Sequence, residues 1–353
     1  MITTEIIKID EKNIESQSEL KKLLKAAEII RNGGLVVFPT ETVYGLGANA
    51  LDAIAVKKIY EAKGRPPDNP LIVHVSNPED IYKYAYVTET AEKIIKKFMP
   101  APLTLVLRKK DKTLDCASPN LDTVAIRAPK NKTARKLIEL AGVPVAAPSA
   151  NLSGKPSHTN PEYIIKDLDG RADMIICGEN SEIGLESTVI SFNEDESINI
   201  LRSGYITREM LSEYKICEYK NNIEIPEHPR SPGMKYTHYS PDAPLYILSG
   251  NEKETVDFIK KESYNNYNKK IGFMCFDEFL EYFKDNKNTA LISISIGGKN
   301  NLEEQGKNLF DALNKFNLIG VDIIYSAEPV KTGIGEAIYN RLIKAAGGRI
   351  VKL

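Results

Sequence analysis

The segment FPTETVYGLG, Phe38–Gly47, decides the fold class of this chain. An apolar strand, Leu35–Phe38, runs into a proline, two threonines that flank a glutamate, and two glycines. In open α/β sheets such turns lie at the carboxyl ends of strands, where backbone and hydroxyl donors bind ligands. The same residues also suit a plain turn before a helix that starts near Asp52. Composition alone leaves both interpretations open.

Helical and strand patterns alternate on either side of this segment. Apolar residues between Leu20 and Ile30 follow helical spacing, and Gly33-Gly34 ends that helix. Some later strands follow one another without an intervening helix, which predicts a mixed α/β sheet. The expected helices are 52–62, 89–98 and 133–140, and the expected strands are 71–75, 103–107, 124–126, 145–147, 174–177, 187–192 and 198–201.

The pattern stops between about Lys215 and Pro244, where NNIEIPEHPRSPGMKYTHYSPDAP contains five prolines. A long irregular stretch of this kind is either a linker or a functional loop. A second, cleaner alternation follows it and predicts a small parallel α/β domain. We therefore expect a first domain over 1–214, a linker or lid over 215–244, and a C-terminal domain over 245–353.

Composition excludes several classes of function. The 353 residues include 47 basic and 48 acidic side chains, and a net charge of −1 gives no broad basic field for nucleic acid or membrane surfaces. No apolar run could span a bilayer and no export signal is visible, so we expect a cytoplasmic protein with no membrane partner. The four cysteines form no CxxC pair and are expected to be isolated, buried thiols. We expect no preformed metal site, although a Mg²⁺ that arrives with a nucleotide would leave no such signature.

The loop after the helix 52–62 carries the clearest anion-binding pattern. In KGRPPDNP, one glycine separates Lys63 from Arg65, and three prolines stiffen the loop around Asn69. Two cations held in this way form a pre-organised anion clamp. A helix C-terminus also favours lysine, arginine and glycine. The clamp is the better interpretation, because capping does not explain the rigid segment that follows.

Polar residues also end several other strands. Arg127 ends an apolar strand, where its planar guanidinium could hold a carboxylate. Ser149 and Asn151 follow the next strand with no His/Asp partner at a recognisable spacing, which is typical of ligand contacts rather than a nucleophile. GLESTV and the Arg202-Ser203-Gly204 turn add a fifth polar loop, whereas His74 alone resembles a core histidine. Together these loops predict a polar, anion-holding cavity in the first domain.

The motifs occur together in one known family. FPTETVYGLG, KGRPPDNPL, PAPLT, VAIRAPK, APSANLSG and ESTVI follow one another in the order found in the YrdC-like family. SPGMKYTHYSP at Ser231–Pro241 and a second domain containing TGIGEAIYNRLIKAAGG resemble its longer members, the L-threonylcarbamoyl-AMP synthases. The resemblance implies a twisted, mixed open sheet with a large concave cavity, followed by a smaller Rossmann-like parallel domain.

The resemblance also implies a reaction. Synthases of this family join L-threonine, bicarbonate or CO₂, and ATP with its Mg²⁺ into threonylcarbamoyl-AMP and pyrophosphate. The product feeds the machinery that transfers the threonylcarbamoyl group to tRNA, next to the anticodon. A carbamate decomposes in water, so the expected site is largely closed. No residue is an obvious general base, so we expect positioning and electrostatics to dominate.

The family motifs assign roles residue by residue. The KxR and SxN pairs supply the expected catalytic residues, Lys63, Arg65, Ser149 and Asn151. The expected ATP contacts are Arg65, Asn69, Thr123, Ser149, Ser157, Arg202, Tyr236 and Tyr239. The two tyrosines reflect the hypothesis that the linker closes over the cavity as a lid. The expected threonine contacts are Thr42, His74, Arg127, the backbone at Ala147, and Ser187, with Arg127 as the carboxylate partner.

Two other classes of function are alternatives. A concave YrdC-type surface could bind double-stranded RNA or tRNA weakly, but the net charge and the lack of a basic stripe interleaved with aromatics argue against it. The C-terminal domain could sense a nucleotide through Gly333-Ile-Gly335, although a lone GxG is more often an ordinary helix start. Pyrophosphate release that needs threonine and bicarbonate together would distinguish the enzyme from both.

Overall fold

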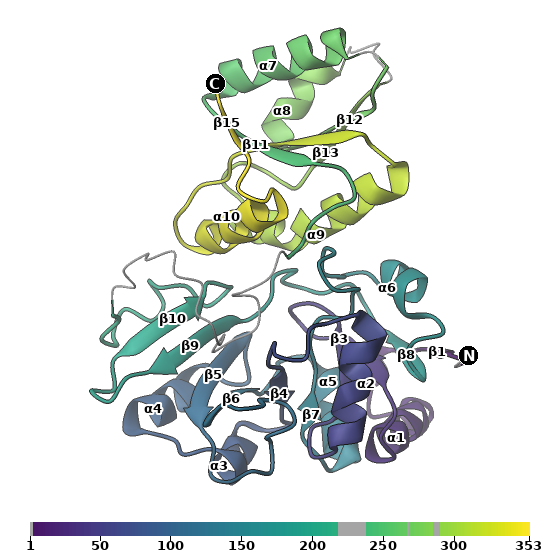
Figure 1. Ribbon diagram of the computed structural model, residues 1–353, viewed down its shortest axis with the longest axis vertical. Helices are drawn as coiled ribbons and strands as arrows, with labels where there is room; N and C mark the ends of the chain where they lie inside the picture. Colours follow the sequence, from purple (N-terminus) through teal and green to yellow (C-terminus); the bar gives the residue numbers. More distant parts are fainter. Residues whose placement is uncertain (1–2, 218–237, 267, 285–289) are drawn as a thin grey trace. The chain divides into compact units, whose positions relative to one another are not determined.

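The computed structural model describes residues 3–217, 238–266, 268–284 and 290–353 (Figure 1). These residues form two compact units. The first comprises 3–153, 158–182 and 186–217, and the second comprises 238–353 together with two short segments, 154–157 and 183–185.

The first unit is built on a ten-stranded sheet with the order β1-β8-β2-β3-β7-β4-β6-β5-β9-β10. Neighbours are parallel at β1–β8, β8–β2, β4–β6 and β5–β9, and antiparallel elsewhere, which confirms the predicted mixed sheet. The strands are β1 (Glu5–Lys8), β2 (Val36–Phe38), β3 (Gly45–Asn49), β4 (Ile72–His74), β5 (Leu103–Arg108), β6 (Thr123–Arg127), β7 (Val145–Ala146), β8 (Met174–Cys177), β9 (Thr188–Phe192) and β10 (Ile198–Arg202).

Five of the six α-helices described in the first unit begin at a residue whose side chain caps the helix. Asp52 accepts hydrogen bonds from the backbone N–H groups of Ile54 and Ala55, and Gly64 ends the same helix with a φ of 61°. This pair of caps fixes Lys63 as the last helical residue. The helices are α1 (Gln17–Arg31), α2 (Ala53–Lys63), α3 (Ile81–Tyr84), α4 (Glu89–Phe98), α5 (Lys132–Ala141) and α6 (Pro161–Leu168), with 3₁₀ turns at Glu11–Asn13 and Pro78–Asp80.

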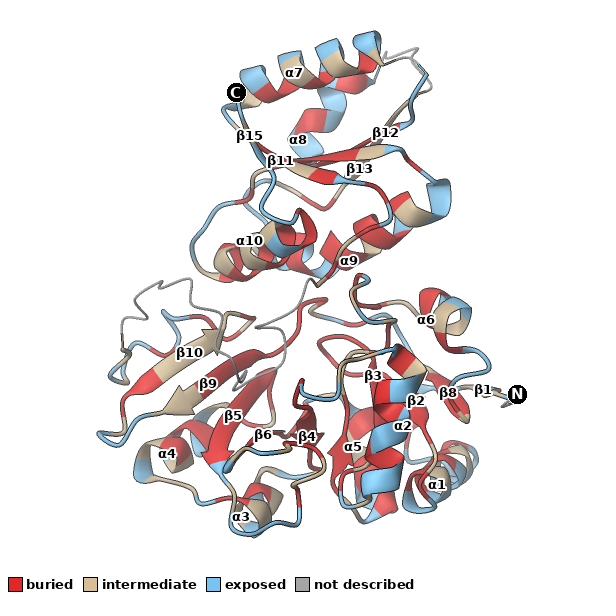
Figure 2. Ribbon diagram, viewed as in Figure 1, coloured by how far each residue is buried: buried red, intermediate tan, exposed pale blue. Residues whose placement is uncertain are grey.

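Alternate residues of the strands build two separate cores. One core packs α2, α3, α4 and α6 against one face of the sheet through residues such as Val37, Leu46 and Val73. The other packs α1 and α5 against the opposite face through Val36 and Phe38. Figure 2 shows the strands mainly as buried and the outward side of α2 as exposed.

The face of the sheet that α1 and α5 cover carries fewer apolar residues over β4, β6, β5 and β9 than over the strands beneath these helices. Its apolar cluster there is small, and consists of Ile72, Val106, Ala125 and Val189 with Leu201 packed against it. Side chains two residues apart along a strand point to the same face. The polar neighbours of these apolar residues at that spacing therefore lie on this face as well. We call this surface the polar face; it is defined by His74, Thr104, Thr123 and Arg127.

The glycines of the opening segment correct one expectation. Gly45 and Gly47 do not belong to a ligand-binding turn, because they lie in strand β3. A Cβ at Gly47 would lie 2.6 Å from the Phe38 ring and 2.8 Å from Val145 Cγ1. A Cβ at Gly45 would lie 3.3 Å from both the ring and Ala147 Cβ. The two glycines therefore make room for the Phe38 side chain across the sheet.

The second unit is a parallel α/β domain, as predicted. Its sheet has the order β13-β12-β14-β11-β15, so the first and fourth strands exchange places relative to the usual dinucleotide-binding order. Helices α7 and α8 cover one face and α9 and α10 the other (Figure 1). The elements are β11 (Leu245–Ser249), α7 (Glu252–Asn265), β12 (Ile271–Cys275), α8 (Asp277–Leu280), a 3₁₀ turn (Glu281–Phe283), β13 (Leu291–Ser295), α9 (Leu302–Ile319), β14 (Ile323–Ala327), α10 (Ile334–Ala345) and β15 (Ile350–Lys352).

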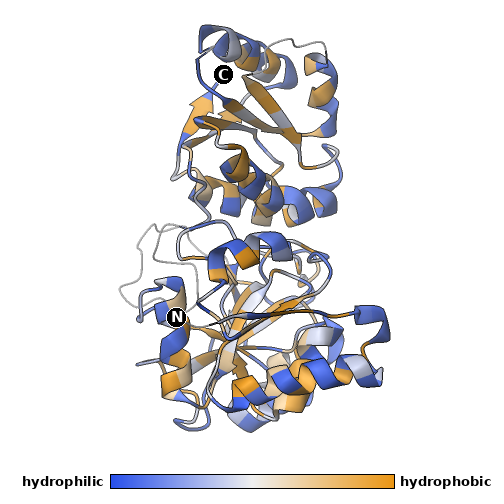
Figure 3. Ribbon diagram, turned by 90° about the vertical axis from the view of Figure 1, so that its right-hand side faces the viewer, coloured by the Kyte–Doolittle hydropathy of each residue, from blue (hydrophilic) through white to orange (hydrophobic). Residues whose placement is uncertain are grey.

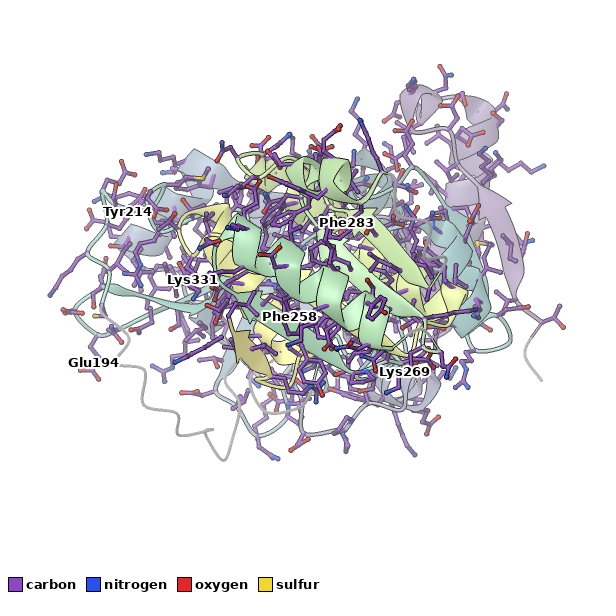
Figure 4. All side chains as sticks on the ribbon, turned by 90° about the horizontal axis from the view of Figure 1, so that it is seen from above. Glu194, Tyr214, Phe258, Lys269, Phe283 and Lys331 are labelled. Atoms are coloured by element: carbon purple, nitrogen blue, oxygen red, sulfur yellow. The ribbon has the colours of Figure 1, made fainter. Side chains whose placement is uncertain are left out.

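Aromatic packing holds helices to this second sheet. Phe258 of α7 meets the ring of Tyr325 in β14 edge-on, with centroids 5.2 Å apart, and Phe283 meets Phe273 of β12 at 5.7 Å. Figure 4 labels Phe258 and Phe283 among the side chains of this unit. The strands of this sheet are coloured as hydrophobic in Figure 3. Its core is therefore an ordinary apolar one.

The expectation that the four thiols are buried is wrong for three of them. Only Cys275 among the four cysteines is buried; Cys116, Cys177 and Cys217 are half-buried, and none forms a disulfide. In the described part of the chain, no helix is both long and apolar enough to cross a membrane.

Candidate active site

The last turn of α2 places a buried cation beside the loop that follows β7. The Lys63 side chain donates hydrogen bonds to the backbone carbonyls of Ser149 and Asn151. Its own carbonyl accepts from the N–H of Ser153 at 2.9 Å. Burial, and then the charge of Arg65, hold the pKa of Lys63 well below its usual value. Lys63 therefore fixes the Ser149–Asn151 segment from inside the protein.

Arg65 lies in the loop between α2 and β4. Its guanidinium donates to the backbone carbonyls of Asn69 and Pro70, the latter at 3.1 Å. Asn69 is buried, and its side-chain oxygen has no hydrogen-bond partner among the described residues. Since a buried amide oxygen without a donor is costly, Asn69 is suited to accept a bond from a ligand.

The polar loop after β7 is held between two strands. The N–H of Ala147 donates to the carbonyl of Ile72 at 2.9 Å, and the N–H of Leu46 donates to the carbonyl of Pro148 at 3.0 Å. Ser149 forms an isolated bridge with Gly45. The predicted residues Ala147, Ser149 and Asn151 therefore sit on a rigid frame made by β3, β4 and Lys63.

Arg127 ends β6 with almost no exposure to solvent. Its Nη1 donates to the hydroxyl of Thr42 at 3.0 Å, and its Nη2 lies 2.6 Å from Oε1 of Glu41. The Arg127 and Glu41 side chains are only 4% and 2% exposed, so this is a buried ion pair. Arg127 and Thr42, both predicted threonine contacts, are thus in direct contact.

His74 lies beside Arg127, because the two residues pair across β4 and β6. Its ring contacts the Phe38 ring edge-on, and its Nδ1 lies 3.2 Å from the carbonyl of Ile72. Burial, and then the neighbouring charge of Arg127, lower the pKa of His74 to about 3. The imidazole is therefore neutral near pH 7, and can hydrogen-bond without adding a second charge.

Ser187 and Arg202 meet at the start of β9 and the end of β10. The Arg202 guanidinium donates to the carbonyl of Ser187 at 3.0 Å and to its hydroxyl at 3.1 Å. The same hydroxyl lies 2.7 Å from that of Thr104 in β5. A residue expected to bind threonine and one expected to bind ATP are therefore neighbours.

Other predicted residues lie apart from these contacts. Thr123 begins β6 and Arg127 ends it, so four residue steps, about 13 Å, separate them along the same face. Ser157 belongs to the second unit, as does Tyr239, whose buried ring packs on Phe310 of α9 with centroids 5.2 Å apart. Tyr236 lies outside the described residues.

The sequence reasoning missed two residues of this site. Glu41 is the buried partner of Arg127, and Thr104 shares the hydroxyl of Ser187. Both stand in motifs that the sequence displays, TET and PAPLT. The available signal was an acid next to two hydroxyls in a strongly apolar setting, which needs a buried cation nearby.

Two of the cavities among the described residues of the first unit are lined mostly by residues outside these contacts. One has a volume of about 370 Å³ and reaches Thr40 and Glu41; its remaining walls include Glu11, Lys12, Lys130, Asn131, Lys132, Glu179, Asn180 and Glu182. The other, about 730 Å³, lies over α4 and is lined by lysines that are each paired with an acid. Within the described ranges, no three His, Cys, Asp or Glu side chains gather in a way that could hold a metal ion.

Comparisons with known proteins identify the family of this chain. Residues 28–204 match the profile of a family described as "Telomere recombination" (Sua5_yciO_yrdC), and residues 206–347 match one described as "Threonylcarbamoyl-AMP synthase, C-terminal domain". The chain is 44% identical to the threonylcarbamoyl-AMP synthase of Bacillus subtilis, over 94% of both chains.

Two archaeal comparisons cover nearly the whole chain. The threonylcarbamoyl-AMP synthase of Pyrococcus abyssi is 40% identical over 97% of this chain and 98% of its own length. A crystal structure of P. abyssi Sua5 complexed with L-threonine superposes with a TM-score of 0.84, at 38% identity, over 100% of this chain and 99% of the other. The chain therefore belongs to the family of threonylcarbamoyl-AMP synthases, enzymes of nucleotidyltransferase type, in its two-domain Sua5 form.

Proposed function

We propose that this enzyme forms L-threonylcarbamoyl-AMP and pyrophosphate from L-threonine, bicarbonate or CO₂, and ATP. The observation that carries the proposal is the 44% identity to the B. subtilis synthase over 94% of both chains. The product would supply the threonylcarbamoyl group for the tRNA adenosine next to the anticodon. We place the activity in the cytoplasm, in keeping with four thiols that form no disulfide.

The threonine subsite would lie around the end of β6. Arg127 offers a guanidinium for the substrate carboxylate, and Thr42 fixes one corner of it at 3.0 Å. The neutral ring of His74 and the hydroxyl of Ser187 provide uncharged donors or acceptors for the rest of the amino acid. The P. abyssi Sua5 structure in complex with L-threonine supports this choice of substrate.

The ATP subsite would extend from the Lys63–Asn69 segment along β6 towards Thr123. Arg65 and Arg202 supply the positive charge for the phosphates, and Asn69 presents its unused amide oxygen. Lys63 would act by holding the Ser149–Asn151 loop in place. Cationic groups fixed in advance in this way stabilise charge that develops during adenylyl transfer.

Mg²⁺ fits this proposal only as a partner of ATP. The described residues offer no acidic cluster that could hold the ion without nucleotide, so the phosphates of ATP would provide most of its ligands. When bound, the ion would neutralise phosphate charge; the groups of the protein would bind, orient and exclude water.

The test is pyrophosphate release by the purified full-length chain with Mg²⁺ and ATP. We expect release only when L-threonine and bicarbonate are both present. Equal release without threonine would contradict the synthase reaction. Tight binding of double-stranded RNA with no such release would favour the alternative, an RNA-binding module.

A further inference from the structure

Glu41 is a buried carboxylate to which the proposed chemistry gives no role. Its side chain is 2% exposed, and Oε2 accepts a long hydrogen bond of 3.4 Å from the N–H of Asn131, the residue that caps α5. Arg127 is the only cation within 4.0 Å of Glu41 among the described residues. A charge this deeply buried needs a close partner, so Glu41 and Arg127 depend on one another.

The contact between these two side chains is close but is not a directed hydrogen bond. Nη2 of Arg127 and Oε1 of Glu41 are 2.6 Å apart, yet neither atom has a hydrogen-bond partner of acceptable geometry among the described residues, and the same holds for Nε of Arg127. Only Nη1 is engaged, by the hydroxyl of Thr42. Glu41 therefore balances the charge of the guanidinium and leaves the donors of the Nε–Nη2 edge available.

That edge is one on which an arginine binds a carboxylate through two parallel hydrogen bonds. A ligand carboxylate can bind this edge while the ion pair with Glu41 stays in place, because neither Nε nor Nη2 donates a hydrogen bond within the described residues. The anchor at the other corner is itself fixed: the hydroxyls of Thr42 and Thr40 are 2.8 Å apart, and Thr40 donates to the carbonyl of Val43 at 2.6 Å.

We propose that Glu41 is the positioning residue for recognition of the substrate carboxylate. It balances the charge of Arg127 and keeps the guanidinium oriented inside the protein, with the Nε–Nη2 edge turned to an α-amino acid. The inference deepens the proposed function and rests on it, because it takes the ligand of Arg127 to be the carboxylate of the amino-acid substrate.

The test compares Glu41→Gln with Glu19→Gln. Glu19 is another buried glutamate of the first unit that pairs with a cation, Lys22 at 2.8 Å. It lies on α1, and its side chain accepts hydrogen bonds from Asp10, Ser18 and Lys22 rather than from a residue of the polar face. We expect E41Q to raise the threonine KM at least about tenfold, while kcat and the ATP KM stay within about twofold. E19Q should lower the melting temperature and leave all three constants unchanged. Glu41→Asp, which keeps the charge on a shorter side chain, should give an intermediate threonine KM.

The outcomes separate the inference from the proposed function. A folded E41Q, or E41D if E41Q does not fold, with the wild-type threonine KM would overturn the role of Glu41 while the synthase reaction stands. An equal rise in the ATP and threonine KM would also overturn it, because that pattern indicates general distortion of the site. Wild-type enzyme that releases pyrophosphate without threonine would instead contradict the proposed function.

Discussion

The end of α2 and the end of β6 each bury a positive side chain in the first unit, but they compensate it differently. Lys63 and Arg127 are both 3% exposed. The partners of Lys63 are backbone carbonyls, those of Ser149 and Asn151. The partners of Arg127 are side chains, the carboxylate of Glu41 and the hydroxyl of Thr42.

The difference indicates what each cation can do for a ligand. The carbonyls around Lys63 are fixed by the chain, so its hydrogen bonds hold a loop in place and its pKa falls with burial. An arginine keeps its charge in proteins and carries five N–H donors, so Arg127 can serve Thr42 and still bind a ligand. We therefore expect Lys63 to act through structure and Arg127 through direct contact.

The largest effect should come from Lys63→Met, which keeps the aliphatic stem and removes the ammonium. Two buried carbonyls would lose their donor, so we expect a melting temperature lower by about 5 °C. Turnover should fall by about 10² or more, because the catalytic loop loses its support. Differential scanning fluorimetry and pyrophosphate release measure the two quantities.

Arg65→Ala is the matched control for this variant. Arg65 also donates to backbone carbonyls, but within its own loop, at Asn69 and Pro70. Turnover should again fall strongly, with a melting temperature close to that of the wild type. If K63M melted like the wild type as well, the contrast between a supporting and a contacting cation would be lost.

The next largest effect should come from Arg127→Lys. The substitution keeps the charge beside Glu41 but removes the planar fork, so a substrate carboxylate loses its paired hydrogen bonds. We expect the threonine KM to rise between about tenfold and 100-fold, with little change in the ATP KM. Initial rates at varied threonine and varied ATP measure both. A larger effect on ATP than on threonine would assign Arg127 to the nucleotide instead.

The sequence predicted the regular elements better than the irregular ones. Helix Glu89–Phe98 and strand Met174–Cys177 occur with the predicted bounds, because the helix has apolar residues at helical spacing and the strand is a short continuous apolar run. Strand β3 was missed because Gly45 and Gly47 have low strand propensity, and the packing of Phe38 that requires them is visible only in three dimensions. The short edge strands β1 and β15 also lacked a signal of their own.

The site was predictable as a set of residues but not as a set of contacts. Lys63 reaches carbonyls 86 and 88 positions away, and Arg127 reaches a hydroxyl 85 positions away. Backbone carbonyls as the partners of Lys63 leave no trace in the sequence, since any residue type supplies one. Glu41 was visible in the TET motif, but its pairing with Arg127 depends on the sheet order.

A smaller effect concerns the pH dependence of stability, because the buried position beside Arg127 lowers the pKa of His74. His74 has a folded-state pKa of about 3 against an ordinary value of 6.5, so below pH 6.5 the unfolded chain binds a proton that the folded chain does not. Its contribution to stability is complete above pH 6.5 and is lost as the pH falls towards 3. We expect a loss of about 1.4 kcal/mol per pH unit from this group. Urea unfolding at several pH values between about pH 6.5 and pH 5 should show that the free energy of unfolding depends less steeply on pH in His74→Gln than in the wild type. Equal slopes would mean that His74 binds its proton as readily in the folded protein as in the unfolded chain.

The smallest effect should divide the two ends of the polar face. Thr123→Val and Thr104→Val each remove one hydroxyl and keep the shape of the side chain. Thr123 begins β6, about 13 Å from Arg127, whereas the Thr104 hydroxyl contacts Ser187 at 2.7 Å. One neutral hydrogen bond contributes about 1 kcal/mol, so T123V should raise the ATP KM by about fivefold and T104V the threonine KM by a similar factor. T123V should leave the threonine KM unchanged, because Thr123 lies about 13 Å from Arg127. T104V should also raise the ATP KM, but by a smaller factor, because the Ser187 hydroxyl that Thr104 contacts also accepts from Arg202. If T123V raised both constants equally, ATP and threonine would have to share one end of the face, and the separate roles of Lys63 and Arg127 would need to be reassigned.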